Sequence, residues 1–114
     1  MSKKIAVVIT EDPTKSHRPV EALRIALGLC AGDHDTSVVL LGKSSVLVGE
    51  DIDDVVDVDI LEKCRPSLAR LGVPFFVESG SETLRLQNRF LVTGKDPLEI
   101  RTFLASVDQA IIFS

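Results

Sequence analysis

A run of apolar residues ends at Thr10, and the polar loop 11–18 follows it. The loop contains Glu11, His17, a second carboxylate and two cations. Because an imidazole titrates near neutral pH, His17 could act as a general acid or base there. The same residues also suit a solvated turn that leads into a helix beginning near Pro19. Thr10, Glu11 and His17 are therefore candidate residues of a small-ligand pocket, with a plain turn as the alternative.

A second polar loop, Glu78, Ser79, Gly80 and Ser81, follows the third apolar run. Backbone N–H groups and hydroxyls between a strand and a helix can hold an anion, helped by the helix dipole. Helix capping accounts for the same residues, since Ser79 and Glu82 have capping-box spacing before a short segment that extends to about residue 88. The loop lacks the Gly-Lys-Ser/Thr element of a Walker motif, and the chain has no G-x-G-x-x-G. Both interpretations, an anion pocket and a cap, stay open.

The two cysteines, Cys30 and Cys64, fall on the apolar stripes of two predicted helices. Unpaired cysteines usually pack as small hydrophobic residues. A nucleophilic thiol needs a lowered pKa and access to solvent, and the cations Lys63 and Arg65 point to other faces of the helix than Cys64 does. The chain has no C-x-x-C pair. A structural role is the first interpretation, and sulfur chemistry at Cys64 or Cys30 is the alternative.

Residues 50–62 hold seven acidic residues and no basic one, a local charge of −7 in a chain whose net charge is −4. A calcium-binding EF-hand loop needs glycine at its sixth position and glutamate at its twelfth, and no register of this segment provides both. We therefore predict no metal site here. The segment is expected to form a solvated loop and the first turn of the next helix.

Strand-like and helix-like segments alternate along the chain, which predicts how these residues are positioned. Most of the apolar runs do not alternate with polar residues, which is typical of strands buried on both faces. The expected strands are 4–10, 36–41, 73–77, 90–93 and 109–113.

Three longer segments have helical periodicity. One begins near Pro19 and ends at Gly32, and a second, from residue 60 to 71, is interrupted by Pro66, so we expect a kink or two short helices. The third begins with Asp96 as its cap and Glu99 completing a capping box. Its predicted buried stripe is Ile100, Phe103, Leu104 and Val107.

This alternation predicts one domain, residues 1–114, with a three-layer α/β/α sandwich around a mostly parallel five-stranded sheet. Ligands of such sheets bind beyond the carboxyl ends of the strands. We therefore expect the loop 11–18 and the loop that begins at Glu78 to lie on the same rim of the sheet.

Composition excludes several classes of protein. The net charge of −4 has the wrong sign for wrapping a phosphate backbone, and the chain has no Trp and no Tyr to stack on bases. We expect no nucleic-acid partner. No apolar run approaches the ~20 residues of a membrane helix, and the start of the chain lacks a convincing export signal. A cytoplasmic protein with reduced thiols and no membrane partner is the expectation.

Five features of the chain form one pattern: the opening strand 4–10, the aliphatic first helix, the strand ending Val38-Val-Leu-Leu-Gly42, the segment Leu68-Ala-Arg-Leu-Gly-Val73 and the closing 107–113. This pattern resembles the DsrE/DsrF-like family of small sulfur-relay proteins, which includes the TusC and TusD subunits. The resemblance covers nearly the whole chain. It implies the α/β/α fold and assembly into trimers or hexamers.

The resemblance also implies a persulfide-carrying cysteine shortly after the third strand. Carried over by spacing from Gly72-Val73, that cysteine would fall at or next to Glu78, where this chain has Val77-Glu78-Ser79 and no thiol. A carboxylate cannot carry a persulfide.

We therefore predict a DsrE-like non-catalytic subunit or binding protein without a cofactor. It would act as an oligomer with itself or with related sulfur-relay subunits. Two alternatives remain: a small-anion or small-ligand binding protein or enzyme that uses Glu78 and His17, and a persulfide carrier that uses Cys64 or Cys30.

Overall fold

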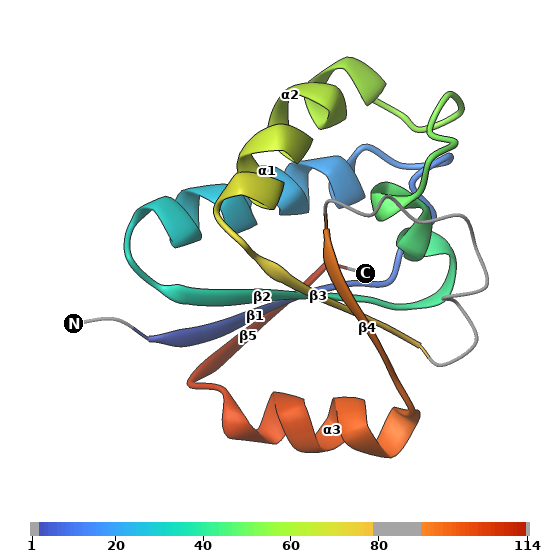
Figure 1. The fold of residues 1–114 in the computed structure, drawn as a ribbon. Coiled ribbons are helices and arrows are strands. Elements are labelled where there is room, and N and C mark those ends of the chain that lie inside the picture. The colour runs from blue at the N-terminus through green and yellow to red at the C-terminus, as the bar shows by residue number, and fades with distance from the viewer. Residues whose placement is uncertain (1–2, 79–89, 114) are drawn as a thin grey trace.

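Strands and helices alternate along the chain in the computed structural model, which describes residues 3–78 and 90–113 (Figure 1). The elements in chain order are β1 (Lys4–Ile9), α1 (Arg18–Ala31), β2 (Asp35–Leu40), the 3₁₀ helix η1 (Gly42–Val48), α2 (Val58–Arg70), β3 (Pro74–Glu78), β4 (Leu91–Lys95), α3 (Pro97–Ser106) and β5 (Gln109–Phe113). The expected strands are all found, with bounds that differ from the prediction by at most two residues. The expected short segment that begins at Ser79 lies outside the described residues.

The strands form one sheet in the order β4-β3-β2-β1-β5, and every neighbouring pair is parallel. Figure 1 shows α1 and α2 together on one face of this sheet and α3 on the other. The predicted three-layer α/β/α sandwich with a mostly parallel five-stranded sheet is confirmed.

Burial on both faces of the sheet explains the unbroken apolar sequence of β1. Val7 and Ile9 belong to the larger core cluster, which packs against α1 and α2, and both are fully buried. Val8 points to the opposite side and packs with Val39 of β2 and Ile100 of α3. We call these two sides the α1/α2 face and the α3 face. A strand covered on both faces has no position at which a polar side chain could reach water.

Of the two outcomes expected at Pro66, a kink or two short helices, the division into two helices is wrong, because α2 runs as one helix through Pro66. Proline removes one backbone hydrogen bond from the helix interior. Two leucines, Leu61 and Leu68, lie on either side of Pro66 in sequence and are both fully buried in the larger core. Their burial holds the two halves of the helix against the same core, and Pro66 itself is exposed.

The acidic segment, which was expected to form a solvated loop, packs two of its apolar side chains into the core. Ile52 and Val55 are buried in the larger core cluster, while the carboxylates between them are exposed. Before this segment, η1 buries Leu47 and Val48, an element that the sequence reasoning missed. The expectation that the segment also supplies the first turn of the next helix agrees with a start of α2 at Val58.

The capping box at the start of α3 forms as predicted. The Glu99 N–H donates to Asp96 Oδ1 at 2.8 Å, and the Asp96 N–H donates to Glu99 Oε1 at 3.1 Å. Of the predicted stripe, Ile100 is buried, Phe103 and Leu104 are half-buried, and Val107 is the residue that ends the helix.

Replacing the cap should weaken the fold measurably. We expect Asp96→Ala to lower the free energy of unfolding by about 1 kcal/mol, because backbone N–H groups at the helix start lose their acceptor. Asp96→Asn keeps an acceptor oxygen and should recover most of that loss. Urea denaturation of the three proteins measures the difference, and equal midpoints for Asp96→Ala and the unmodified protein would contradict it.

Candidate functional site

The carboxyl ends of all five strands lie at one rim of the sheet, because every strand is parallel to its neighbours. This rim carries the loop after β1, the turn after β2 and the end of β3 at Glu78. The two polar loops singled out in the sequence therefore begin on the same rim, as topology requires. Ser79, Gly80 and Ser81, the other predicted residues of the second loop, lie outside the described residues.

Glu78 is held by the turn that follows β2. The Gly42 N–H donates a hydrogen bond to Glu78 Oε1 at 2.5 Å. Gly42 has φ +59°, a left-handed conformation that strains any residue with a Cβ. Ser44, two residues after Gly42, is buried. Its hydroxyl group forms hydrogen bonds to the backbone carbonyls of Ile9 and Leu41. The turn is thus fastened to β1 while its backbone N–H fixes the carboxylate at the end of β3.

A cavity of about 340 Å³ opens beside Glu78 on the α3 face. Its volume falls within the range typical of small-molecule sites. Glu78 and Arg101 are the charged residues among those that line it, and the others are aliphatic: Leu41, Pro97, Ile100 and Leu104. The cavity therefore offers an apolar body with an anion and a cation at its wall. Sequence reasoning found Glu78 but missed Arg101, although the helical stripe that includes Ile100 and Leu104 indicated this side of α3.

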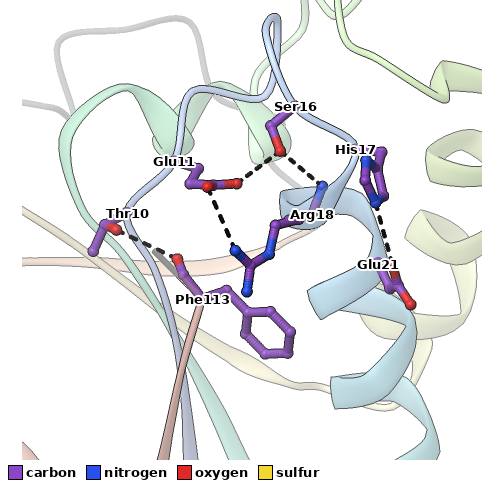
Figure 2. Close-up of polar contacts among 7 residues, drawn as sticks. All are labelled: Thr10, Glu11, Ser16, His17, Arg18, Glu21 and Phe113. Atoms are coloured by element: carbon purple, nitrogen blue, oxygen red, sulfur yellow. Dashed lines mark hydrogen bonds and ion pairs between the residues drawn. The ribbon is translucent and has the colours of Figure 1, made fainter.

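Several polar groups of the loop after β1 bond to other groups of the same loop (Figure 2). The Glu11 carboxylate accepts a hydrogen bond from the Ser16 hydroxyl at 2.7 Å and lies 3.9 Å from the Arg18 guanidinium. The Ser16 hydroxyl in turn accepts the Arg18 N–H at 3.2 Å. At the start of the loop, the Thr10 hydroxyl donates to the Phe113 carbonyl of β5 at 3.3 Å. Glu11 thus acts as a local tie within the loop, and Thr10 ties the end of β1 to β5.

His17 is exposed at the start of α1, with Nε2 3.9 Å from the Glu21 carboxylate (Figure 2). No hydrogen bond or ion pair within residues 3–78 and 90–113 joins His17 to Glu78. The two predicted site residues therefore share a rim but have separate partners. A joint role for them stays a prediction.

Asp12, the second carboxylate of this loop, was not among the candidate site residues, and its carboxyl has a lowered pKa. Hydrogen bonds from the Thr14 hydroxyl at 2.7 Å and the Thr14 N–H at 2.9 Å lower the pKa of its carboxyl, and Lys43, at 3.9 Å, acts in the same direction. The Asp-Pro-Thr sequence is the signal that could have identified this turn, since aspartate commonly bonds to the backbone two residues on.

The two cysteines lie away from the residues that line the cavity. Cys64 is buried in α2, and Cys30 is half-buried in α1, each against the larger core cluster. Burial raises the pKa of the Cys64 thiol, and the cation Arg24 only partly opposes this effect. The thiol is therefore held in its protonated, weakly nucleophilic form near neutral pH.

Arg65, next to Cys64, is the most deeply buried charged residue in the described part of the chain, at 1% exposure. Its guanidinium donates to the Gly49 carbonyl at 2.8 Å and lies over the Phe90 ring, 5.3 Å from the centroid. These contacts tie α2 to the end of η1 and to the residue before β4. The sequence analysis placed Arg65 on another helix face than Cys64 and did not anticipate its burial.

In residues 3–78 and 90–113, no three side chains of His, Cys, Asp or Glu gather in a way that could hold a metal ion. None of the helices in the described ranges has both the length and the apolar character needed to cross a membrane.

The fold has a counterpart among solved structures. The crystal structure of the ychN protein from E. coli superposes with a TM-score of 0.77 over 99% of this chain and 100% of that chain, at 20% sequence identity. No protein-family model matches the sequence, and no curated protein matches it. The likeness thus establishes the fold, which is the one that the sequence pattern implied.

The buried environment of Cys64 predicts slow alkylation. Because the thiolate is the reacting species and its pKa is raised, we expect iodoacetamide to modify Cys64 in the folded protein more slowly than in the urea-unfolded chain. The rate should rise steeply only when the pH exceeds the ordinary range of a thiol pKa. Mass spectrometry of peptides after timed labelling measures both rates. Equal rates in the folded and unfolded protein at neutral pH would refute this prediction.

Proposed function

We propose that this protein is a DsrE-type subunit that has no relay cysteine and that works by binding rather than by carrying sulfur, as a homo-oligomer or with related sulfur-relay subunits. The observation that carries the proposal is the position of Glu78. It ends β3 at the carboxyl rim of a DsrE/TusC-like fold, its carboxylate is fixed by the Gly42 N–H, and it lines the rim cavity.

The chemistry of the remaining thiols supports this proposal. A sulfur carrier needs an accessible thiolate, whereas Cys64 is buried with a raised pKa. Cys30 is half-buried on the core side of α1. Neither cysteine lines the cavity beside Glu78. A carrier role for Cys64 or Cys30 is therefore the weaker alternative.

A substitution at the rim tests the proposal. Incubated with inorganic polysulfide near neutral pH, the unmodified protein should take up sulfane sulfur slowly. Glu78→Cys should gain a rapidly formed persulfide, because it places a thiol at an accessible strand end. Intact-mass spectrometry after short incubation compares the two proteins.

Glu78→Ser provides the matched control, since it removes the carboxylate without adding a thiol. Uptake in this variant should equal that of the unmodified protein. Rapid persulfide formation on Cys30 or Cys64 of the unmodified protein would overturn the non-catalytic assignment and favour the carrier.

The cavity favours one second candidate, a binding protein for a small molecule. An aliphatic wall with Glu78 and Arg101 suits a ligand that has an apolar part and an acidic group. In that case Arg101 would pair with the acidic group, and Leu104 would contact the apolar part.

Thermal-shift measurements separate the two candidates. A ligand-binding protein should be stabilised by short-chain aliphatic carboxylates, and the shift should disappear in Arg101→Gln. Sulfate, phosphate and nucleotides form the comparison set for an anion site without an apolar requirement. Unchanged melting temperatures with all of these probes would remove this candidate.

A further inference from the structure

Strand β5 forms an edge of the sheet and pairs only with β1 in the described part of the chain. Its sequence, Gln109-Ala-Ile-Ile-Phe113, contains no charged residue, no proline and no glycine. Natural edge strands usually carry such residues, or a bulge, to prevent pairing with another strand. The opposite edge, β4, contains Gly94 and Lys95. Strand β5 is therefore the edge without this protection.

Backbone hydrogen bonding shows which groups of β5 face away from the sheet. The Thr10 N–H donates to the Phe113 carbonyl at 3.1 Å, so the main chain of Phe113 faces β1. Successive residues of a strand direct their N–H and C=O groups to opposite sides. Ile111 consequently faces β1 as well, and the N–H and C=O groups of Ala110 and Ile112 face outward.

The side chains of these two residues also lie in the open. Ile112 is in register with Val8, which belongs to the cluster on the α3 face, so Ala110 and Ile112 project on that face. Helix α3 covers Val8, Val39 and Phe76 but leaves Ile112 61% exposed and Ala110 exposed. Parallel sheets normally have both faces covered. Unpaired backbone groups and an uncovered apolar side chain thus coincide on β5.

We propose that β5 pairs in antiparallel orientation with β5 of a second copy of this chain, about a two-fold axis at Ile111. In this register Ala110 stands opposite Ile112 of the second copy, and both pairs exchange backbone hydrogen bonds through their outward groups. Ile111 stands opposite Ile111 of the second copy as a non-hydrogen-bonded pair. Hydrogen-bonded and non-hydrogen-bonded pairs then alternate along the two strands, as antiparallel pairing requires.

Side-chain size and charge favour a second copy as the occupant. The small Ala110 lies beside the large Ile112 on the α3 face, and Gln109 stands opposite Phe113, so no charged pair is brought together. A two-fold contact of this kind is self-complementary. This inference rests on the proposed function, which includes self-association. It assigns that self-association to a surface distinct from the cavity at Glu78.

A single cysteine tests the register. In a Cys30→Ser, Cys64→Ala background, Ile111→Cys should form an intermolecular disulfide under mild oxidation, because Cα atoms of such a pair lie about 4.5 Å apart, within the range of disulfides. Ile112→Cys in the same background should cross-link less, since its own counterpart lies diagonally at about 7–8 Å. Non-reducing electrophoresis gives the yields. Equal yields, or none from Ile111→Cys, would overturn the register.

Sedimentation tests the surface itself with two matched substitutions. Ile112→Lys should raise the dissociation constant of the β5 contact at least about tenfold, as expected for a buried residue at the centre of an interface. Leu98→Lys changes an equally exposed leucine of α3, at 69% exposure, and should leave association unchanged. Circular dichroism confirms that both variants fold.

The outcomes separate this inference from the proposed function. An unmodified protein with an even number of subunits that is halved by Ile112→Lys supports the β5 contact. A trimer, or an oligomer unaffected by Ile112→Lys, overturns the β5 contact and leaves the proposed self-association standing. A strict monomer across micromolar concentrations overturns the β5 contact and the homo-oligomeric form of the proposed function, and leaves assembly with related subunits as the form that remains.

Discussion

A single constraint, the parallel direction of all five strands, fixes most of the molecule. Parallel neighbours cannot be joined by tight hairpins, so the described connections that contain α1, α2 and α3 cross a face of the sheet, and these helices follow from that requirement. The same constraint collects every strand end at one rim. The turn at Gly42 and the end of β3 at Glu78 come within hydrogen-bonding distance there, although they are 36 residues apart in sequence.

The distribution of the helices decides which surfaces stay open. Two helices and the larger core cluster lie on the α1/α2 face, whereas α3 is the one helix of the described residues that packs on the other. A helix of 10 residues is about 15 Å long, and its buried side chains reach Val8, Val39 and Phe76. The uneven cover leaves a cavity beside Glu78 on one side of α3 and bare side chains on β5. The proposed function uses the cavity beside Glu78, and the proposed dimer contact uses the exposed side chains of β5.

Local ties hold the polar loops, which limits what they can do chemically. Glu11 is engaged by Ser16 and Arg18, and Asp12 by Thr14. These hydrogen bonds and the ion pair hold the backbone of the loop between β1 and α1 in place. The Glu78 carboxylate differs, because it is anchored through one oxygen to a backbone N–H and lies beside an apolar wall. This difference is why the rim at β3, rather than the loop after β1, is the stronger candidate.

The alternation of strands and helices, the parallel sheet and the cap of α3 could be predicted from the amino-acid sequence, because these depend on residue type and short-range spacing. Unbroken apolar runs such as 5–9 require cover on both faces, and Asp96 and Glu99 bond within one helical turn. Three features became evident from the folded chain alone: Pro66 stays within one helix, Arg65 and Ile52 are buried, and Arg101 lines the same cavity as Glu78. Those outcomes depend on packing between segments distant in the chain, and a local pattern carries no information about which distant neighbour a side chain will meet.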